Sequence, residues 1–279
     1  MKIKHILSLL LLLPCLTWAT AEQDVGAELK KLAWQNGPIS ADIASKAKIK
    51  IPKDYVYLDA QNTRRFLELA GNPPQDGNFL VAPQSLRWFA IFSYDESGYI
   101  KDDEKIDPAD LLDKLRQSDI PSNEERKRLG MPALFTDGWQ VLPHYDTNTN
   151  RLEWGLRLKT ENGEKSINYT SRLLSRSGVM SAVLVSEVDR LGPDTAEFKT
   201  ALKNFTFNAG ENYSEFKDGD KIAEYGLGAL ILGGAAAVAA KKGFFALIGG
   251  FLVAFWKVLI GLAIAALASF KSWFSRKKE

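Results

Sequence analysis

Cysteine and histidine are scarce in this 279-residue sequence, which has one cysteine, Cys15, and two histidines, His5 and His144. A disulfide requires two cysteines, and the common zinc and iron–sulfur sites require several cysteine or histidine ligands. The glycine-rich loops that bind phosphates and the GxSxG turn of many hydrolases are also missing from the body of the chain. We therefore expect no disulfide, no metal site and no cofactor.

The first 21 residues follow the order of a secretory signal peptide. Lys2 and Lys4 precede the apolar run of residues 6–13, and small residues occupy the −3 and −1 positions before Glu22. The apolar run is much shorter than the about 20 residues that span a bilayer, which argues against a retained anchor. We expect cleavage between Ala21 and Glu22, with export of the remaining chain.

Cleavage at this point would also remove Cys15 and His5. A lipoprotein interpretation of Cys15 is weaker, because Pro14 precedes it where a small residue is required. The mature chain would then contain no thiol and a single histidine, His144. That composition excludes thiol catalysis and any site that needs two histidines.

Charge is distributed unevenly along the chain. The formal net charge is +2, yet residues 22–240 carry 27 Lys and Arg against 33 Asp and Glu, and residues 241–279 carry seven against one. Proteins that bind nucleic acids cluster basic residues on a folded face. An acidic body with a basic tail therefore argues against a nucleic-acid partner.

A long apolar segment, residues 225–270, precedes a short basic tail, residues 271–279. Its second part, residues 244–270, would be about 40 Å long as a helix, against about 30 Å for the hydrocarbon core of a bilayer. Its first part is short and rich in glycine and alanine, including Gly233 and Gly234, a composition that lets helices pack closely in lipid. We therefore expect membrane-anchor helices here, with self-association through the Gly/Ala helix as one use of the first part.

The number of spans decides on which side of the membrane the chain ends. One full span would leave the basic tail in the cytoplasm, as the positive-inside tendency favours, whereas two spans would place Lys241 and Lys242 there. We favour one span, with a hairpin of two spans as the alternative. Lys257 lies near the middle of the longer apolar part, where a charge is costly. We expect it to reach toward the head groups, the alternative being a functional contact inside the membrane.

Residues 22–207 have the pattern of an extracytoplasmic α+β domain. Alternating apolar residues predict strands at 45–51, 55–58, 87–94, 138–144, 151–159, 165–174 and 179–186. Capping residues and apolar faces predict helices at 26–34 and 59–70, from Pro108, at 123–130 and from Pro193. Short turns join the last four strands. We expect one antiparallel sheet, its last four strands a meander, flanked by helices.

Residues 208–224 form a polar, glycine-containing juxtamembrane segment. Tyr213 and Phe216 are too hydrophobic for a pure spacer, so we expect them to dock against the body or the lipid surface. Asp220 and Lys221 are expected to cap the first membrane-proximal helix.

His144 is the strongest catalytic candidate in the sequence. It could act as a general base, oriented by Asp146, with Ser171 or Ser175 as the nucleophile. Nothing in the spacing fixes that geometry. We favour the interpretation in which Asp146 begins the turn at residues 146–150 through an Asx hydrogen bond and His144 is an ordinary residue at the end of a strand.

The acidic run Asp102, Asp103 and Glu104, with Asp107 close by, contains the oxygen ligands that a divalent cation prefers. It lacks the spacing and the glycine of a calcium-binding loop. We favour a solvated loop that leads into a helix capped by Asp107.

Three arginines, Arg157, Arg172 and Arg176, lie on neighbouring predicted strands. They would form an anion pocket if all three faced the same side of the sheet. We favour the alternative, in which they pair with carboxylates across the strands.

A set of short motifs is spread over nearly the whole mature chain. The motif residues are Trp34, Gln35, Gly37, Glu96, Gly98, Tyr99, Pro143, Tyr145, Asp146, Leu152, Trp154, Asn168, Tyr169, Arg172, Asp220, Lys221, Ala223, Tyr225, Gly226 and Leu227. Together they resemble a bacterial family of membrane-anchored proteins of unknown function (domain of unknown function 2167). The resemblance implies an exported body on a C-terminal anchor in a Gram-negative envelope, and it supplies no catalytic residues. The order of helices and meander also looks loosely like the sandwich of PsbP-like and Mog1-like proteins, an analogy of fold alone.

These observations favour a non-enzymatic role. We expect a protein of the inner membrane whose bulk lies in the periplasm, acting as a binding or assembly-support module that holds a partner protein of the membrane or periplasm. The alternative is a periplasmic hydrolase that uses His144.

Overall fold

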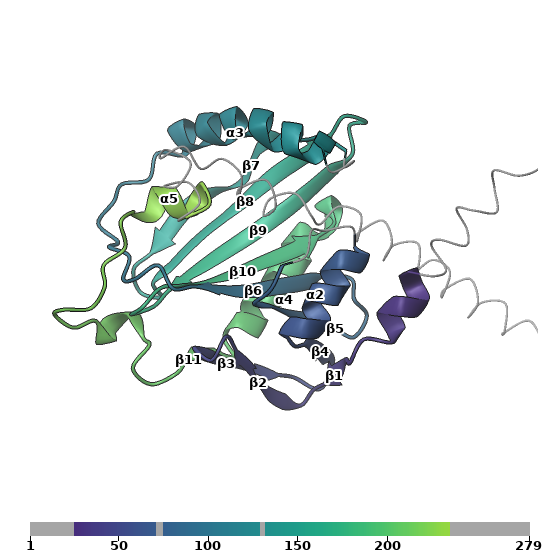
Figure 1. Ribbon diagram of the computed structural model, residues 1–279, viewed down its shortest axis with the longest axis horizontal. Helices are drawn as coiled ribbons and strands as arrows, with labels where there is room; N and C mark the ends of the chain where they lie inside the picture. The colour runs from purple at the N-terminus through teal and green to yellow at the C-terminus, as the bar shows by residue number, and fades with distance from the viewer. Residues whose placement is uncertain (1–24, 71–74, 129–131, 235–279) are drawn as a thin grey trace, which may run out of the picture.

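An antiparallel sheet of eight strands forms the centre of the molecule (Figure 1). The computed structural model describes residues 25–70, 75–128 and 132–234. In spatial order the strands are β1 (Gln35–Asn36), β4 (Tyr55–Leu58), β5 (Asn78–Pro83), β6 (Phe89–Asp95), β10 (Val179–Ser186), β9 (Lys165–Leu174), β8 (Arg151–Thr160) and β7 (Leu134–Asp146). The α+β class and the large antiparallel sheet with helices against it are confirmed.

The strands β7 to β10 form the predicted meander. Each pairs with the next through a short turn, so that Tyr169 on β9 lies opposite Gly155 on β8 and Leu184 on β10. The edge strand β7 is longer than expected and has three register shifts against β8. Such irregularities make an edge strand a poor template for pairing with another chain.

A second, smaller sheet was not anticipated. It consists of β11 (Phe205–Phe207), β3 (Ala47–Ile51) and β2 (Ile39–Ile43), all antiparallel. Our expectation of a single sheet was therefore wrong. The reason is non-local pairing, because β11 is only three residues long and finds its partner more than 150 residues earlier in the sequence.

Two helices begin where their capping residues predict. The Asp59 side chain accepts a hydrogen bond from the backbone N–H of Asn62 at the start of α2 (Ala60–Leu69), at 2.9 Å. The Asp107 side chain accepts from the backbone N–H groups of Ala109 and Asp110 at the start of α3 (Pro108–Arg128). These bonds satisfy donors that the helix itself leaves unpaired.

The α3 helix continues through Pro121, where we expected two separate helices. A proline inside a helix removes a backbone hydrogen bond. Contacts with β7 hold the second half in place: Asp119 accepts from the N–H and the hydroxyl of Thr136, and the Asn123 amide bonds the N–H and C=O of Leu134. Tertiary hydrogen bonds thus override the tendency of proline to interrupt a helix.

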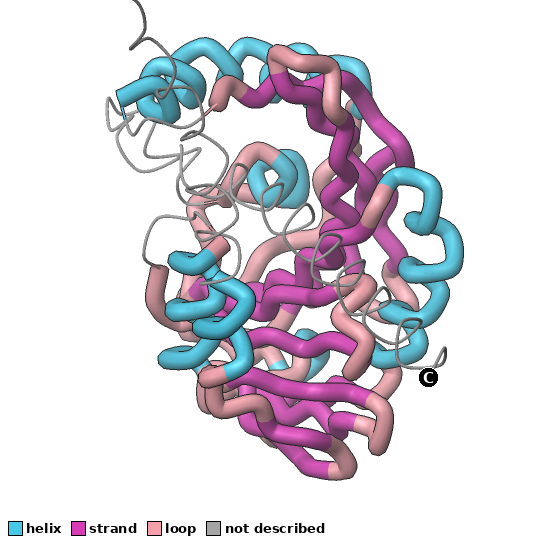
Figure 2. Tube along the Cα trace, turned by 90° about the vertical axis from the view of Figure 1, so that its right-hand side faces the viewer, coloured by secondary structure: helices cyan, strands magenta, loops and turns pink. Residues whose placement is uncertain are grey.

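Alternation along the strands gives the large sheet two apolar faces. One face packs against the small sheet and α4 (Leu191–Leu202), which follows the short helix η1 (Val188–Arg190). The other face packs against α2 at one end and against α3 and α5 (Leu227–Ile231) at the other. Figure 2 shows that the strands curve rather than lie in one plane, with helices on both faces.

The segment of residues 208–226, here called the strap, docks on the body and contains the short helix η2 (Tyr213–Glu215). The Tyr99 ring stacks on Tyr213, with centroids 4.4 Å apart, and on Phe216, with centroids 4.2 Å apart. The Tyr99 N–H donates to the carbonyl of Lys221, and the Ala223 N–H donates to the carbonyl of Tyr99. Tyr213 and Phe216 therefore dock against the body, one of the two outcomes that we expected.

The residues just after the strap belong to the folded body. Leu227, Leu230 and Ile231 of α5 are buried against the large sheet, although we expected the membrane-anchor helices to start at residue 225. Gly233 and Gly234 have positive φ angles of 111° and 63°, and the Gly234 N–H donates to the carbonyl of Ala229. This hydrogen bond is typical of a helix that ends at glycine. Gly233 and Gly234 therefore terminate α5, whereas we expected them to lie within a membrane helix.

Several predicted features lie outside the described residues: the cleavage site at Ala21 and Glu22, the apolar segment from residue 235 with Lys257, and the basic tail. Within the described ranges, no helix combines the length and the apolar character needed to cross a bilayer.

Candidate functional site

His144 lies near the end of β7, but Asp146 does not orient it. The Asp146 carboxylate accepts from the N–H of Asn148 at 2.9 Å and from the hydroxyl of Thr149 at 2.8 Å, which makes it the first residue of an Asx turn. The half-exposed His144 ring instead places Nδ1 3.3 Å from the carbonyl of Leu142 and Nε2 3.5 Å from a carboxylate oxygen of Glu153.

Glu153 is the centre of a polar cluster that sequence reasoning missed. Its side chain is buried on β8, and it accepts hydrogen bonds from Tyr169 at 3.0 Å, Ser171 at 3.2 Å and the Lys199 ammonium at 2.8 Å. Burial alone would raise the pKa of the Glu153 carboxyl, but the hydrogen bond and charge of Lys199, together with the hydrogen bonds from Tyr169 and Ser171, outweigh it and lower that pKa. In the sequence, the only signal for Glu153 is its position between two apolar strand residues, Leu152 and Trp154.

This cluster does not have the arrangement of a hydrolase. Ser171 donates to Glu153, and Ser175 donates to the carbonyl of Gly178 and lies 2.7 Å from the hydroxyl of Tyr94. Among the described residues, neither serine is hydrogen-bonded to His144. A nucleophilic serine needs a base within hydrogen-bond reach, so the predicted catalytic set is not assembled.

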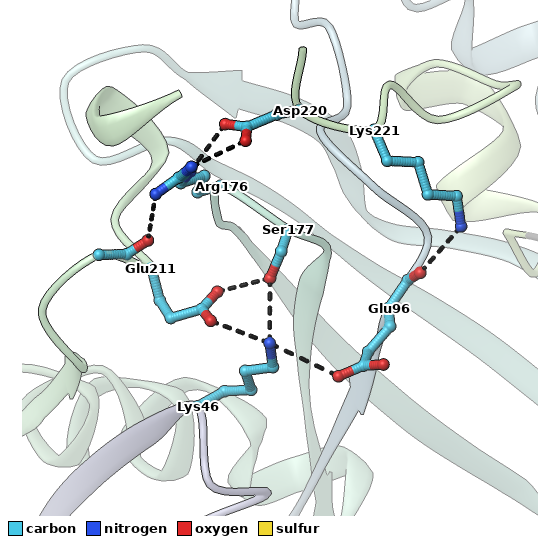
Figure 3. Close-up of a pocket in the computed structure, with 8 residues that line it drawn as sticks. Lys46, Glu96, Arg176, Ser177, Glu211, Asp220 and Lys221 are labelled. Carbon is cyan, nitrogen blue, oxygen red and sulfur yellow. Dashed lines mark hydrogen bonds and ion pairs between the residues drawn. The ribbon is translucent and has the colours of Figure 1, made fainter. Parts of the chain in front are cut away.

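A second polar site, here called the polar pocket, has a volume of about 400 Å³ and lies where the strap meets the body (Figure 3). The residues that line it come from four segments far apart in the sequence: Lys46, Glu96, Arg176, Ser177, Gly210, Glu211, Asp220 and Lys221. The turns after β6 and β9 and the turn between β2 and β3, which carries Lys46, supply the body side, and the strap supplies the other side. The pocket therefore exists only because the strap is docked.

Ion pairs cross the polar pocket between body and strap. The Arg176 guanidinium donates to both carboxylate oxygens of Asp220, each at 2.7 Å. The Lys46 ammonium lies 2.9 Å from Glu211 and 3.5 Å from Glu96. Asp220 thus binds the body through Arg176, which corrects our expectation that it would cap a helix.

The charges in the pocket stabilise one another and do not activate a nucleophile. The hydrogen bond from Arg176 lowers the pKa of Asp220 to about 2, and the hydrogen bond to Glu211 raises the pKa of Lys46. Lys46 also lies 3.3 Å from the hydroxyl of Ser177, the pairing used by serine–lysine enzymes. Such a lysine must be neutral to act as a base, whereas a raised pKa keeps Lys46 protonated.

The three arginines do not share a pocket. Arg176 pairs with Asp220, and Arg157 donates to Asp137 at 3.1 Å on the face of the sheet that carries α4. Arg172 lies on the opposite face, where its guanidinium sits 5.9 Å from the Trp154 ring centroid. The structure therefore contradicts a joint anion pocket and leaves Arg172 in separate surroundings.

The acidic run before α3 serves the fold. Asp102 accepts from the Tyr145 hydroxyl at 2.9 Å, and Glu104 accepts from the backbone N–H of Gly228 at 2.9 Å. Asp107 caps α3, as expected. Within the described part of the chain, no group of three or more acidic or histidine side chains is placed to hold a metal ion.

Residues 35–267 match a family described as "Protein of unknown function (DUF2167)". The chain belongs to this family. Motifs that carry the resemblance in the sequence meet in space, because Gly98 lies against Lys221 where the strap crosses the body. A Cβ atom on Gly98, whose φ is 101°, would lie 2.7 Å from the Lys221 carbonyl oxygen, so only glycine fits there without displacement.

No curated protein matches the chain in sequence. Among solved structures, the fold is similar to the solution structure of cyanobacterial PsbP (CyanoP) from Synechocystis sp. PCC 6803. The two are 11% identical with a TM-score of 0.36, over 63% of this chain and 94% of that chain. A likeness of this size carries no conclusion about function.

Proposed function

We propose that the mature chain is an exported protein of the inner membrane, anchored by the apolar segment that begins after residue 234. Its body lies in the periplasm and holds a partner protein close to the membrane. The observation that supports this role most is the docked strap. The segment that leads to the apolar residues is fixed to the body by the Arg176–Asp220 and Lys46–Glu211 ion pairs and by the stacking of Tyr99.

A docked strap matters because a flexible linker would let the body swing freely above a membrane. Here the connection is short and bonded along its length, from Asn208, whose N–H donates to the Lys46 carbonyl, to Ala223, bonded to Tyr99. The body would therefore present one constant side to a partner in the membrane or beside it. The closed ion pairs of the polar pocket and the unassembled catalytic set also favour binding over catalysis.

The test is chemical crosslinking in native membranes with the full-length chain. We expect a discrete crosslinked partner with the wild type and a much lower yield with Arg176→Asp or Asp220→Arg, each of which opposes like charges in the strap. The double variant restores opposite charges and should recover the crosslink. Arg157→Asp, which breaks a comparable ion pair away from the strap, is the matched control. An unchanged crosslink in both single variants would contradict the proposal.

The rival function, a periplasmic hydrolase, is favoured by one observation, the position of the half-exposed His144 beside the buried carboxylate of Glu153. A carboxylate can orient a histidine for proton transfer. In this hypothesis Glu153 takes the orienting role that we predicted for Asp146. A nucleophile or an activated water would still be needed. Complementation of a deletion strain by His144→Ala separates the two functions.

A further inference from the structure

Arg172 is the one arginine of the three singled out in the sequence that has no partner of opposite charge in direct contact. Within the described residues it takes part in no ion pair or hydrogen bond, and its Nε atom is covered and unpaired. Directly opposite on β10 lies Ser181, which is 2% exposed and whose hydroxyl also has no hydrogen-bond partner among the described residues. Residues opposite each other on paired strands point to the same face. A partly buried arginine with a covered, unpaired Nε and a buried serine hydroxyl without a partner therefore share one face of the sheet.

The surroundings of Arg172 leave its positive charge only partly balanced. Trp154 lies beside the guanidinium. The carboxylate of Asp95 on β6 attracts the Arg172 charge but also accepts a hydrogen bond from the Tyr225 hydroxyl at 2.9 Å. Burial lowers the pKa of Arg172 to about 10, against a smaller opposing attraction from Asp95. Arg172 is therefore still charged at neutral pH, in a place where charge is poorly solvated.

An acceptor at this position would remove an energetic penalty. A buried donor without a partner is costly, and a buried charge more so. The planar guanidinium fits a carboxylate through two parallel hydrogen bonds, and a neighbouring hydroxyl can supply a third. A single negative charge suits the site better than a double one, because Asp95 would repel the additional charge.

We propose that Arg172 and Ser181 form a binding site for a carboxylate, supplied either by a small molecule or by an acidic side chain of another protein. The site lies on the face of the sheet that carries α3 and α5, and neither residue lines the polar pocket. The inference does not depend on the proposed anchoring role, because it rests on two unpaired groups of the body.

The test uses the detergent-solubilised full-length chain labelled with 5-fluorotryptophan. The Trp154 resonance, assigned with Trp154→Phe, reports on the neighbouring guanidinium while acetate is titrated against chloride at equal ionic strength and pH 7. We expect a saturable shift that Arg172→Gln abolishes and Ser181→Ala weakens several-fold. Arg157→Gln, on the opposite face of the sheet, should leave the shift unchanged.

Asp95→Asn provides a gain-of-binding variant. It removes a competing negative charge but keeps an oxygen that accepts from Tyr225, so acetate should bind several-fold more tightly. If Arg172→Gln does not fold, Arg172→Lys replaces it, since lysine keeps the charge and loses the two-pronged geometry; weaker binding is expected. Absence of a saturable shift, the same shift without Arg172, or unchanged affinity in Asp95→Asn would overturn the proposal.

The source of the carboxylate is decided in a second arm. A short peptide with one internal glutamate is compared with its glutamine counterpart and with acetate. Tighter binding of the glutamate peptide than of acetate assigns the site to a protein side chain, and tighter binding of acetate assigns it to a small molecule. Equal binding of the glutamate and glutamine peptides, without any response to acetate, would overturn the site itself.

Discussion

Arg176 and Asp220 are 44 positions apart in the sequence and form a two-pronged ion pair, with both N–O distances at 2.7 Å. Arg176 lies in the turn after β9, the third strand of the meander, and Asp220 lies in the strap. This pair joins the part of the chain that resembles an ordinary sheet domain to the part that leads toward the apolar segment. It acts together with the Lys46–Glu211 ion pair and the stacking of Tyr99 to fix the strap to the body.

The first prediction concerns this ion pair. Arg176→Asp and Asp220→Arg should each lower the thermal midpoint of the body, and the double variant should recover most of the loss, because it restores opposite charges. Limited proteolysis is the second readout, with faster cleavage between residues 208 and 226 in the single variants. Equal midpoints and equal cleavage in all four proteins would show that the strap does not depend on the pair.

The same pair predicts a direction of pH dependence. The pKa of Asp220 is lowered to about 2 in the folded chain, below the about 3.9 of an unfolded aspartate. Its stabilising contribution is therefore complete above about pH 4 and lost as the pH falls toward 2. The difference in thermal midpoint between wild type and Asp220→Asn should shrink over that interval. A difference that stays constant down to pH 2 would contradict this assignment.

Much of the fold was predictable because its signals are local. Asp59 and Asp107 cap helices where the sequence places them, and β9 has the predicted bounds. The small sheet escaped prediction since β11 is short and its partner β3 is distant in sequence. We expected two helices where α3 is continuous, because the hydrogen bonds that Asp119 and Asn123 accept from β7 hold the helix together, and a sequence contains no direct trace of such contacts.

The candidate sites were less predictable for a related reason. His144 was found by its chemistry, but its neighbour Glu153 is set by strand register, since the two residues lie opposite each other in the β7–β8 pair. Lys199 reaches Glu153 from a helix 46 residues later. The polar pocket needs four distant segments, so composition and spacing could point only to some of its members.

The second prediction concerns the Glu153–Lys199 pair. Lys199→Met would leave a buried carboxylate without its cation and should destabilise the body by about 1–3 kcal/mol, a figure reduced for the partial exposure of Lys199. Adding Glu153→Gln should recover part of the loss. Because the pKa of Glu153 is lowered in the fold, the effect should fade as the pH falls below about 4. Chemical denaturation of the wild type, the two single variants and the double variant tests this; additive losses would contradict it.

The third prediction separates binding from hydrolysis. His144→Ala should complement every phenotype of a deletion strain, because the binding role does not use the imidazole for proton transfer. Immunoblotting controls for protein level. Full loss of complementation by a stably accumulated variant would instead support the hydrolase, and Glu153→Gln should then fail in the same way.

The fourth prediction concerns the end of the chain. With one membrane span, an alkaline phosphatase fused after residue 279 should be inactive and a fluorescent protein bright, whereas the reverse pattern would establish the hairpin. Lys257→Leu should insert and complement normally if the lysine only reaches toward the head groups, since leucine lowers the cost of insertion. Normal accumulation without complementation would assign Lys257 to a contact inside the membrane.

The central claim, an exported body anchored at its C-terminal side, is tested most directly by protease accessibility in spheroplasts, with an epitope inserted in the turn at residues 161–164. We predict that the full-length mature chain sediments with the inner membrane, begins at Glu22 by mass spectrometry, and loses the epitope when protease is added outside intact spheroplasts. An epitope that becomes sensitive only after the inner membrane is broken, or a chain with Met1 intact, would contradict the claim.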